Sequence, residues 1–294
     1  MDIKLITELS DIEKAWWENE IKSFRAKYIK DPKEYAKIVL LERGITREEL
    51  KINLESIIEV TREKIWQTYL IDEAVFHEKI LTHLAKSRDL PKDILHDIVS
   101  KNLLGSDLGR LTPEQLSEKI SAVVGEFTGR VMPYIYQLSL STTNSRRSRS
   151  GKTFEVLMET LFDIFEYPYG NQSSVGNATY EESNLGKKVD LIVPSIEAYT
   201  QNRPKCAVVT MKTSLRERWQ EVAEELNRTN VPHIYLLTVD KSVTANTVQI
   251  MKRYNITLVL YKTEKESKFK DYSNVQDFQT FFLEEMPHII GYWK

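Results

Sequence analysis

The stretch "CAVVTMKTSLRERWQEVAEE", Cys206 to Glu225, joins two different kinds of predicted secondary structure. It begins with apolar and β-branched residues, as a buried strand does, and its apolar spacing becomes helical from Leu215 onward. The strand pattern ends at Lys212, and the helix pattern begins with the charged triplet Arg216-Glu217-Arg218. A lysine at the end of a buried strand is a candidate functional residue at this edge of the predicted sheet.

The sequence around this stretch predicts an α/β fold. Four short apolar runs read as strands: "VDLIVPS" (189–195), "CAVVTMK" (206–212), "HIYLLTV" (233–239) and "ITLVLY" (256–261). Helical patterns over residues 215–227 and 244–254 separate the last three runs. Strands that alternate with helices favour a sheet that is at least partly parallel. We therefore predict a mixed central sheet flanked by helices.

The sequence before this α/β part predicts an all-helical region. "IEKAWWENEIKSFRAKYI" places its apolar residues at helical spacing, and Thr46 with Glu49 has the pattern of a capping box. Serine, threonine and asparagine in "LSLSTTNSRRSRSG" then interrupt the helical pattern, which indicates a loop at the boundary. We predict a helical N-terminal domain over residues 1–140, for dimerisation, DNA contacts or both, and an α/β domain over residues 141–294.

Composition limits the class of protein. The chain of 294 residues is 41% hydrophobic and 29% charged, which is typical of globular proteins. It has no apolar run long enough for a transmembrane helix, and its first residues lack the apolar core of a signal peptide. Its single cysteine, Cys206, cannot form an internal disulfide. We therefore expect a cytoplasmic protein that does not bind membranes.

A basic segment stands out although the net charge of the chain is −2. "NSRRSRSGK" (144–152) contains Arg146, Arg147, Arg149 and Lys152 and no acid. Local clusters of this kind build the positive field that attracts DNA phosphates, whatever the summed charge is. A phosphate contact and a solvated loop fit this segment about equally well.

Asp190 and Lys212 are candidate catalytic residues, although such a pair taken alone is more often structural. Asp190 stands near the start of one predicted strand and Lys212 at the end of the next, so adjacent strands can bring both to one sheet edge. A carboxylate binds Mg²⁺ through hard oxygens, and an ammonium can orient a water or stabilise a developing negative charge. The commonest nuclease pattern has a second acid two residues before the lysine, where this chain has Thr210. On the following helix, Glu225 lies nearer the predicted buried stripe than Glu224 does, and we take it as the second acid.

The charged triplet has an interpretation of its own. Arginine can donate two hydrogen bonds to O6 and N7 of guanine, and glutamate can accept one from N4 of cytosine. Arg216, Glu217 and Arg218, at the start of a helix that enters the major groove, could therefore read neighbouring G·C pairs. Taken alone, such a triplet is more often a solvated helix start.

Together these residues resemble the EcoRII-like branch of the PD-(D/E)XK type II restriction endonucleases, with relatives that cut CCGG, CCNGG or CCWGG sites. "SRRSRSGKTFE" is similar to the segment that precedes an active-site helix carrying a supporting glutamate, here Glu155. Asp190, Lys212 and Glu225 match the motif acid, the motif lysine and the displaced glutamate of that branch. "KTSLRERW" is the most specific match. Val189 stands where the superfamily has proline. This difference weakens the match to the motif, but it affects the expected chemistry less, since proline binds no metal.

The resemblance implies a Mg²⁺-dependent enzyme that cuts double-stranded DNA at a palindromic site with CC/GG half-sites and leaves 5′-phosphate ends. Asp190 and Glu225 would hold the metal, Glu155 would support it or bind a second ion, and Lys212 would orient the attacking water. A palindromic site calls for a homodimer or a higher oligomer, since each subunit reads one half. A structure-selective PD-(D/E)XK nuclease of DNA repair and a DNA-binding protein without catalysis are the alternatives.

Overall fold

The computed structural model describes residues 4–105, 107–171, 189–215, 220, 224 and 231–294. The chain forms two compact units that are interleaved in sequence. Unit 1 contains Met1–Asp31 and Gln67–Ser148, and unit 2 contains Pro32–Trp66 and Arg149–Lys294. Residues 32–66, which we assigned from the sequence to the helical N-terminal domain, therefore belong to the same unit as the sheet.

Unit 1 is helical, as predicted. It contains α1 (Asp11–Tyr28), the second part of α3 (Arg47–Ser87), α4 (Asp89–Asn102), a short 3-10 helix (Leu108–Arg110), α5 (Pro113–Arg130) and the first part of α6 (Met132–Ile164). Capping boxes start α1 at Ser10 and α5 at Thr112, where the side-chain oxygen satisfies an N–H of the first turn. Trp17 is fully buried and donates a hydrogen bond of 2.8 Å to the carbonyl of Tyr134.

The predicted loop around residues 141–150 is wrong, because this segment lies inside α6. Two hydroxyl groups in and just before it bond to the preceding turn of the helix: Ser139 donates to the carbonyl of Ile135 at 2.9 Å, and Thr143 donates to that of Ser139 at 3.0 Å. Such bonds to the preceding turn let serine and threonine remain in a helix that tertiary packing supports. The basic residues 146–152 and Glu155 are therefore on one continuous helix.

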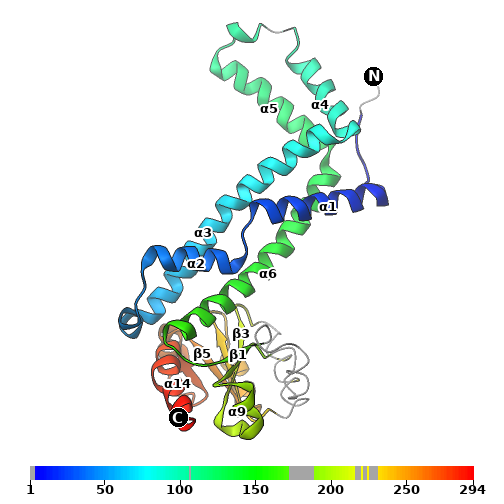
Figure 1. Ribbon diagram of the computed structural model, residues 1–294. Coiled ribbons are helices and arrows are strands. Elements are labelled where there is room, and N and C mark those ends of the chain that lie inside the picture. The colour runs from blue at the N-terminus through cyan, green and yellow to red at the C-terminus, as the bar shows by residue number, and fades with distance from the viewer. Residues whose placement is uncertain (1–3, 106, 172–188, 216–219, 221–223, 225–230) are drawn as a thin grey trace. The chain divides into compact units, whose positions relative to one another are not determined.

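Unit 2 is built on a mixed sheet of six strands, which confirms the predicted fold class (Figure 1). The strands are β1 (Gly170–Asn171), β2 (Leu191–Val193), β3 (Ala207–Lys212), β4 (Ile234–Thr238), β5 (Ile256–Leu260) and β6 (Val275–Asp277), and they lie in this order. β2 is antiparallel to β1 and β3, whereas β3 to β6 are parallel. The parallel strands end at one edge, which is the edge that carries Lys212.

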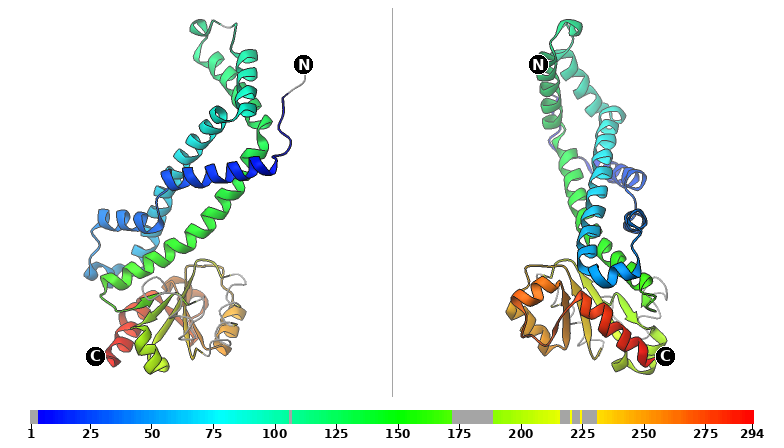
Figure 2. Two further views of the ribbon diagram at one scale, coloured as in Figure 1. Left: turned by 45° about the vertical axis from the view of Figure 1, so that its right-hand side comes forward. Right: turned by 90° about the vertical axis from the view of Figure 1, so that its left-hand side faces the viewer.

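Helices of unit 2 cover both faces of this sheet (Figure 2). Besides α2 (Pro32–Arg43), the first part of α3 and the second part of α6, unit 2 contains α9 (Ile196–Gln201), a 3-10 helix (Arg203–Lys205), α11 (Ala245–Arg253), α12 (Lys262–Lys268), α13 (Phe278–Thr280), a π-helical turn (Phe281–Glu285) and α14 (Met286–Tyr292). Leu236 of β4 packs in one core with Val248 of α11, while Tyr235, its neighbour on the opposite face, contacts the ring of Phe281. Among the described helices, none has the length and hydropathy of a membrane span.

Candidate active site

Asp190 lies directly before β2 and is held by the backbone of β3. Its N–H donates to the carbonyl of Val209 at 2.9 Å, and its Oδ2 accepts a hydrogen bond from the N–H of Met211 at 2.6 Å. The same oxygen accepts from Oγ1 of Thr210 at 3.3 Å. Thr210, which occupies the position of the usual second acid, is fully buried and thus supports Asp190 with a hydroxyl donor.

Lys212 ends β3 beside this carboxylate. Its Nζ lies 3.6 Å from Oδ2 of Asp190 and donates to the carbonyl of Met211 at 2.9 Å. The side chains of Lys212 and Asp190 are 15% and 21% exposed. Because both are largely shielded from water, each charge acts on the other more strongly than at an open surface. The structure therefore brings the predicted acid and lysine together at one sheet edge.

Glu155 of α6 is close enough to act on Asp190 electrostatically. Burial raises the pKa of Asp190, the charge of Lys212 opposes this, and the charge of Glu155 raises the pKa further, so the net shift is upward. Glu155 itself accepts a hydrogen bond of 2.8 Å from Lys152. A carboxylate whose ionisation a neighbouring carboxylate disfavours marks a region that a divalent cation would stabilise.

The remaining predicted groups of this site lie outside the described residues. They are Glu225, proposed as the second acid, and the triplet Arg216, Glu217 and Arg218. Glu224, the alternative acid, is described and is an exposed helical residue. In the part of the chain that the structure describes, no three histidine, cysteine, aspartate or glutamate side chains cluster as metal ligands.

Asp240 is a residue that our sequence reasoning missed. It follows β4, and its Oδ2 accepts the N–H of Leu215 at 2.7 Å, directly before the charged triplet. Its Oδ1 accepts from N and Oγ of Ser242 at 2.8 and 2.5 Å. Its own N–H donates to Oγ1 of Thr238 at 3.1 Å, and Thr238 pairs with Lys212 across the sheet. Asp240 thus fixes the chain where it leaves β3. The sequence signal that could have identified Asp240 is an acidic residue directly after a predicted parallel strand.

The four basic residues predicted to contact phosphates have different surroundings on α6. Nε of Arg146 lies 3.0 Å from both carboxylate oxygens of Glu73, whose side chain is 3% exposed. Burial opposes ionisation of Glu73, but hydrogen bonds from Arg146 and Tyr69 lower its pKa overall. Arg147 is exposed, Arg149 is partly buried and Lys152 is paired with Glu155. The DNA contacts of these residues remain a prediction, although Arg146 clearly also has a structural partner.

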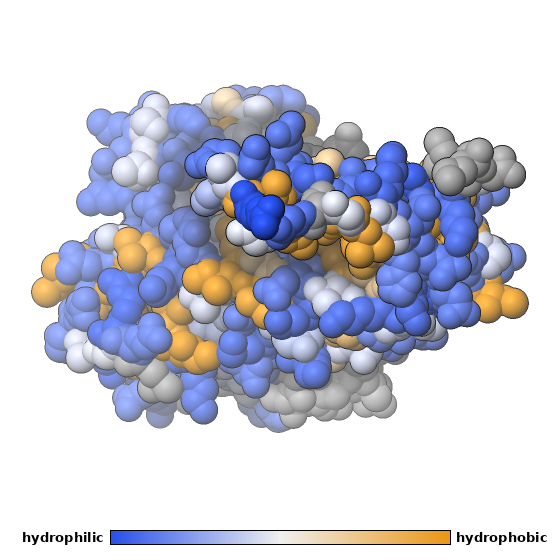
Figure 3. Space-filling view, turned by 90° about the horizontal axis from the view of Figure 1, so that it is seen from above, coloured by the Kyte–Doolittle hydropathy of each residue, from blue (hydrophilic) through white to orange (hydrophobic). Residues whose placement is uncertain are grey.

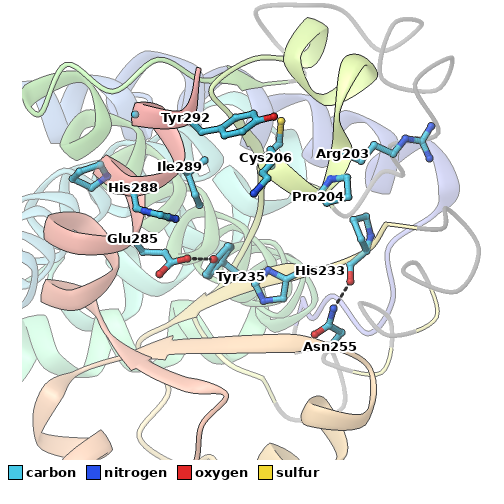
Figure 4. A pocket seen from close by; sticks show the side chains of 14 residues that line it. Arg203, Pro204, Cys206, His233, Tyr235, Asn255, Glu285, His288, Ile289 and Tyr292 are labelled. Carbon is cyan, nitrogen blue, oxygen red and sulfur yellow. Dashed lines mark hydrogen bonds between the residues drawn. The ribbon is translucent and has the colours of Figure 1, made fainter. Parts of the chain in front are cut away.

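A cavity of about 750 Å³ lies at the opposite end of the parallel strands (Figure 4). Cys206 and His233 line it where β3 and β4 begin. Tyr235 donates a hydrogen bond of 2.6 Å to Glu285 in its wall, and burial raises the pKa of the Cys206 thiol to about 11. Since Lys212 is at the other end of β3, this cavity is separate from the predicted catalytic groups.

Comparison with known sequences shows two related restriction enzymes. Type II restriction enzyme SsoII of Shigella sonnei is 37% identical over 163 residues, which are 55% of this chain and 53% of the relative. Type II restriction enzyme EcoRII of Escherichia coli is 26% identical over 126 residues, which are 42% of this chain and 29% of the relative. The chain thus spans about half the length of SsoII, and less of EcoRII.

Solved structures and a family model agree with these matches. Metal-depleted Ecl18kI in complex with uncleaved, modified DNA is 27% identical with a TM-score of 0.77, over 98% of this chain and 87% of that one. The PspGI–substrate DNA complex has a TM-score of 0.57 at 16% identity, over 90% and 94% of the two chains, and this likeness concerns the fold alone. The family model described as EcoRII C terminal matches residues 113–284, more than half of the chain. The chain therefore belongs to the EcoRII C-terminal family of type II restriction enzymes.

Proposed function

We propose that this protein is a Mg²⁺-dependent restriction endonuclease that cuts double-stranded DNA at a palindromic site with CC/GG half-sites. The observation that carries the proposal is the ion pair of Asp190 and Lys212, 3.6 Å apart at the sheet edge of a chain of this family. The DNA complexes of Ecl18kI and PspGI, which share the fold, support DNA as the substrate. Such an enzyme acts in the cytoplasm, where the DNA is.

The donor groups of the site fit a hard cation such as Mg²⁺. Asp190 offers a carboxylate whose pKa is raised by burial and by Glu155, so a bound cation would favour its ionised form. Glu225 would complete the ligand set, with Glu155 in support. A bound Mg²⁺ would stabilise negative charge at the scissile phosphate. The Ecl18kI complex, which pairs metal-depleted protein with uncleaved DNA, is consistent with a metal requirement in that relative.

Lys212 would orient the attacking water. Its ammonium contacts both the carboxylate of Asp190 and the carbonyl of Met211, and these two contacts fix its position beside the carboxylate. From there it would orient a water for attack on the phosphate and stabilise the negative charge that develops. Hydrolysis in which the 3′ oxygen leaves would give a 5′-phosphate end. The hydrogen bonds from Met211 and Thr210 fix the carboxylate against which Lys212 is placed.

Arg216, Glu217 and Arg218 would read the CC/GG half-site. Arginine pairs with guanine and glutamate with cytosine through distinct groups of the major groove. Asp240 anchors Leu215, the residue directly before them, to the edge that carries Lys212. The residues that read bases and the residues that cleave would then be anchored at the same edge of the sheet. Because a palindrome presents two identical half-sites, the active form would be a homodimer.

Digestion of a long DNA with Mg²⁺ tests the proposal. The parent should produce discrete fragments, and Lys212→Ala should bind the same DNA without cutting it. Lys205→Ala is a matched control, since Lys205 lies before β3, at the end opposite Lys212. It should cut as the parent does. Unspecific or structure-selective cutting by the parent would instead indicate a repair nuclease, and binding without any cutting would indicate a DNA-binding protein.

A further inference from the structure

Each of the two described acids of the candidate active site pairs with a lysine. Nζ of Lys212 lies 3.6 Å from Oδ2 of Asp190. On α6, Nζ of Lys152 lies 2.8 Å from Oε2 of Glu155. In the part of the chain that the structure describes, no other lysine or arginine pairs with either carboxylate. Each acid therefore has one lysine as its counterion.

Lys152 is held by more than one carboxylate. Burial lowers the pKa of its ammonium, but the hydrogen bond and the charge of Glu155 raise this pKa. The charges of Glu159 and Asp190 raise it further, so the net shift is upward. Lys152 thus stays protonated in a position where three acids favour positive charge. The same acids would attract a divalent cation that binds beside Asp190.

An ordinary surface ion pair is the alternative explanation. Figure 3 looks onto the end of the molecule with α4 and α5, where the surface is mostly hydrophilic. Arg110 and Asp107 of unit 1 form an ordinary pair, with side chains that are 87% and 61% exposed. The side chains of Lys152 and Glu155 are only 48% and 26% exposed, and Asp190 also acts on the lysine. A helix is stabilised more when glutamate precedes lysine, and this pair has the reverse order, so helix stability alone explains it poorly.

We propose that Lys152 is an internal counterion of the metal site: it neutralises Glu155 in the metal-free protein and is displaced when a divalent cation binds. The inference rests on the proposed function, which supplies the cation. Beside one carboxylate the ammonium and the cation would repel each other, and the cation has the larger charge and a strong preference for carboxylate oxygens. Lys152 can move away because its stem is flexible and its side chain is partly exposed. It would then be free for the phosphate contact predicted from the sequence.

Titration with Mn²⁺ in the absence of DNA, followed by electron paramagnetic resonance of the free ion, provides the test. Lys152→Met keeps an unbranched side chain and removes the charge. It should bind Mn²⁺ about two- to fivefold more tightly than the parent, because the ion no longer displaces a partly exposed ion pair. Lys152→Arg keeps a cation at Glu155 and should bind Mn²⁺ nearly as the parent does.

Two controls separate displacement from a general effect of charge. In Glu155→Gln the lysine has no carboxylate to neutralise at that position, so adding Lys152→Met should change the Mn²⁺ affinity little. A general effect of charge would persist in that background. Lys268→Met is the matched control, because Lys268 pairs with Glu264 at a similar exposure of 45% and 16%. Its helix, α12, contacts β6, four strands from β2, so this variant should bind Mn²⁺ as the parent does.

Melting temperatures show whether the variants fold. Methionine and lysine are both good helix formers, so metal-free Lys152→Met should melt close to the parent, and Lys152→Gln should repeat its gain in affinity. Equal Mn²⁺ affinity of Lys152→Met and the parent, the same gain in the Glu155→Gln background, or a parent that binds no Mn²⁺ would overturn the inference. A parent that cuts DNA while Lys152→Met shows no gain would leave the proposed function intact. A gain in a chain that cuts no DNA would keep the inference and remove the proposed function.

Discussion

Replacing Asp240 with alanine removes the carboxylate that accepts the N–H of Leu215 at 2.7 Å and the N–H of Ser242 at 2.8 Å. Leu215 is 2% exposed, so water replaces the lost acceptor poorly. A hydrogen bond to a charged acceptor contributes about 1.5–3 kcal/mol, and we expect the free energy of unfolding to fall by about 2 kcal/mol. The larger consequence should concern specificity, because the triplet begins at the next residue.

A loosened triplet should lose part of the about 1–3 kcal/mol that each good base contact contributes. We therefore expect Asp240→Ala to reduce discrimination by roughly tenfold. The assay compares kcat/KM on the cognate duplex with kcat/KM on a duplex changed at one half-site base pair. Ser242→Ala is the matched control, since it removes the bond of 2.5 Å to Oδ1 and leaves the Leu215 contact in place. An unchanged discrimination ratio in Asp240→Ala, including equal losses of kcat/KM on both duplexes, would refute the reasoning and leave Asp240 a role in stability alone.

Three further predictions concern charge and reading. Burial and Glu155 raise the pKa of Asp190, so its charge lowers stability as pH rises above the unfolded pKa. Without metal, Asp190→Asn should therefore melt at a higher temperature than the parent at neutral pH, and this difference should disappear in strong acid. The same variant should not cut DNA, and Mg²⁺ should no longer raise its melting temperature. Arg216→Ala or Arg218→Ala should each cost about 1–3 kcal/mol of discrimination per contact in competition binding, and equal weakening on random DNA would reassign them to phosphates. Arg146→Ala should lower the free energy of unfolding in urea by about 2–3 kcal/mol, because the carboxylate of Glu73 stays buried without this partner. The double variant Arg146→Ala with Glu73→Gln should recover part of this free energy. An unchanged free energy of unfolding in Arg146→Ala would contradict the prediction.

The strands were predictable because their residues are apolar and β-branched over whole runs. The runs over residues 206–212 and 256–261 correspond to β3 and β5 within a residue. β1 and β6 were missed, since Gly170–Asn171 is too short for a pattern and Val275–Asp277 is largely polar. The sheet edge that joins Asp190 to Lys212 follows from strand order, and it too could be anticipated from the sequence.

Other features depend on tertiary structure that a local pattern does not contain. Serine and threonine near residue 142 favour a helix break locally, yet α6 continues because tertiary contacts hold it: Ser141 accepts a hydrogen bond from Arg25 and Thr142 is hydrogen-bonded to His77. Helical spacing over residues 32–66 indicates an apolar side but not its partner, so their place in unit 2 was not foreseeable. The same holds for Asp240, whose contact with Leu215 joins two loops that are distant in sequence.

Sequencing the ends of DNA digested with Mg²⁺ tests the central claim most directly, because it gives the site, the cleavage position and the end chemistry together. We predict that every end falls at a fixed position within one palindrome containing CC/GG half-sites and carries a 5′-phosphate. Asp190→Ala should yield no such ends. Ends spread over unrelated sequences, or ends that persist in Asp190→Ala, would contradict the account.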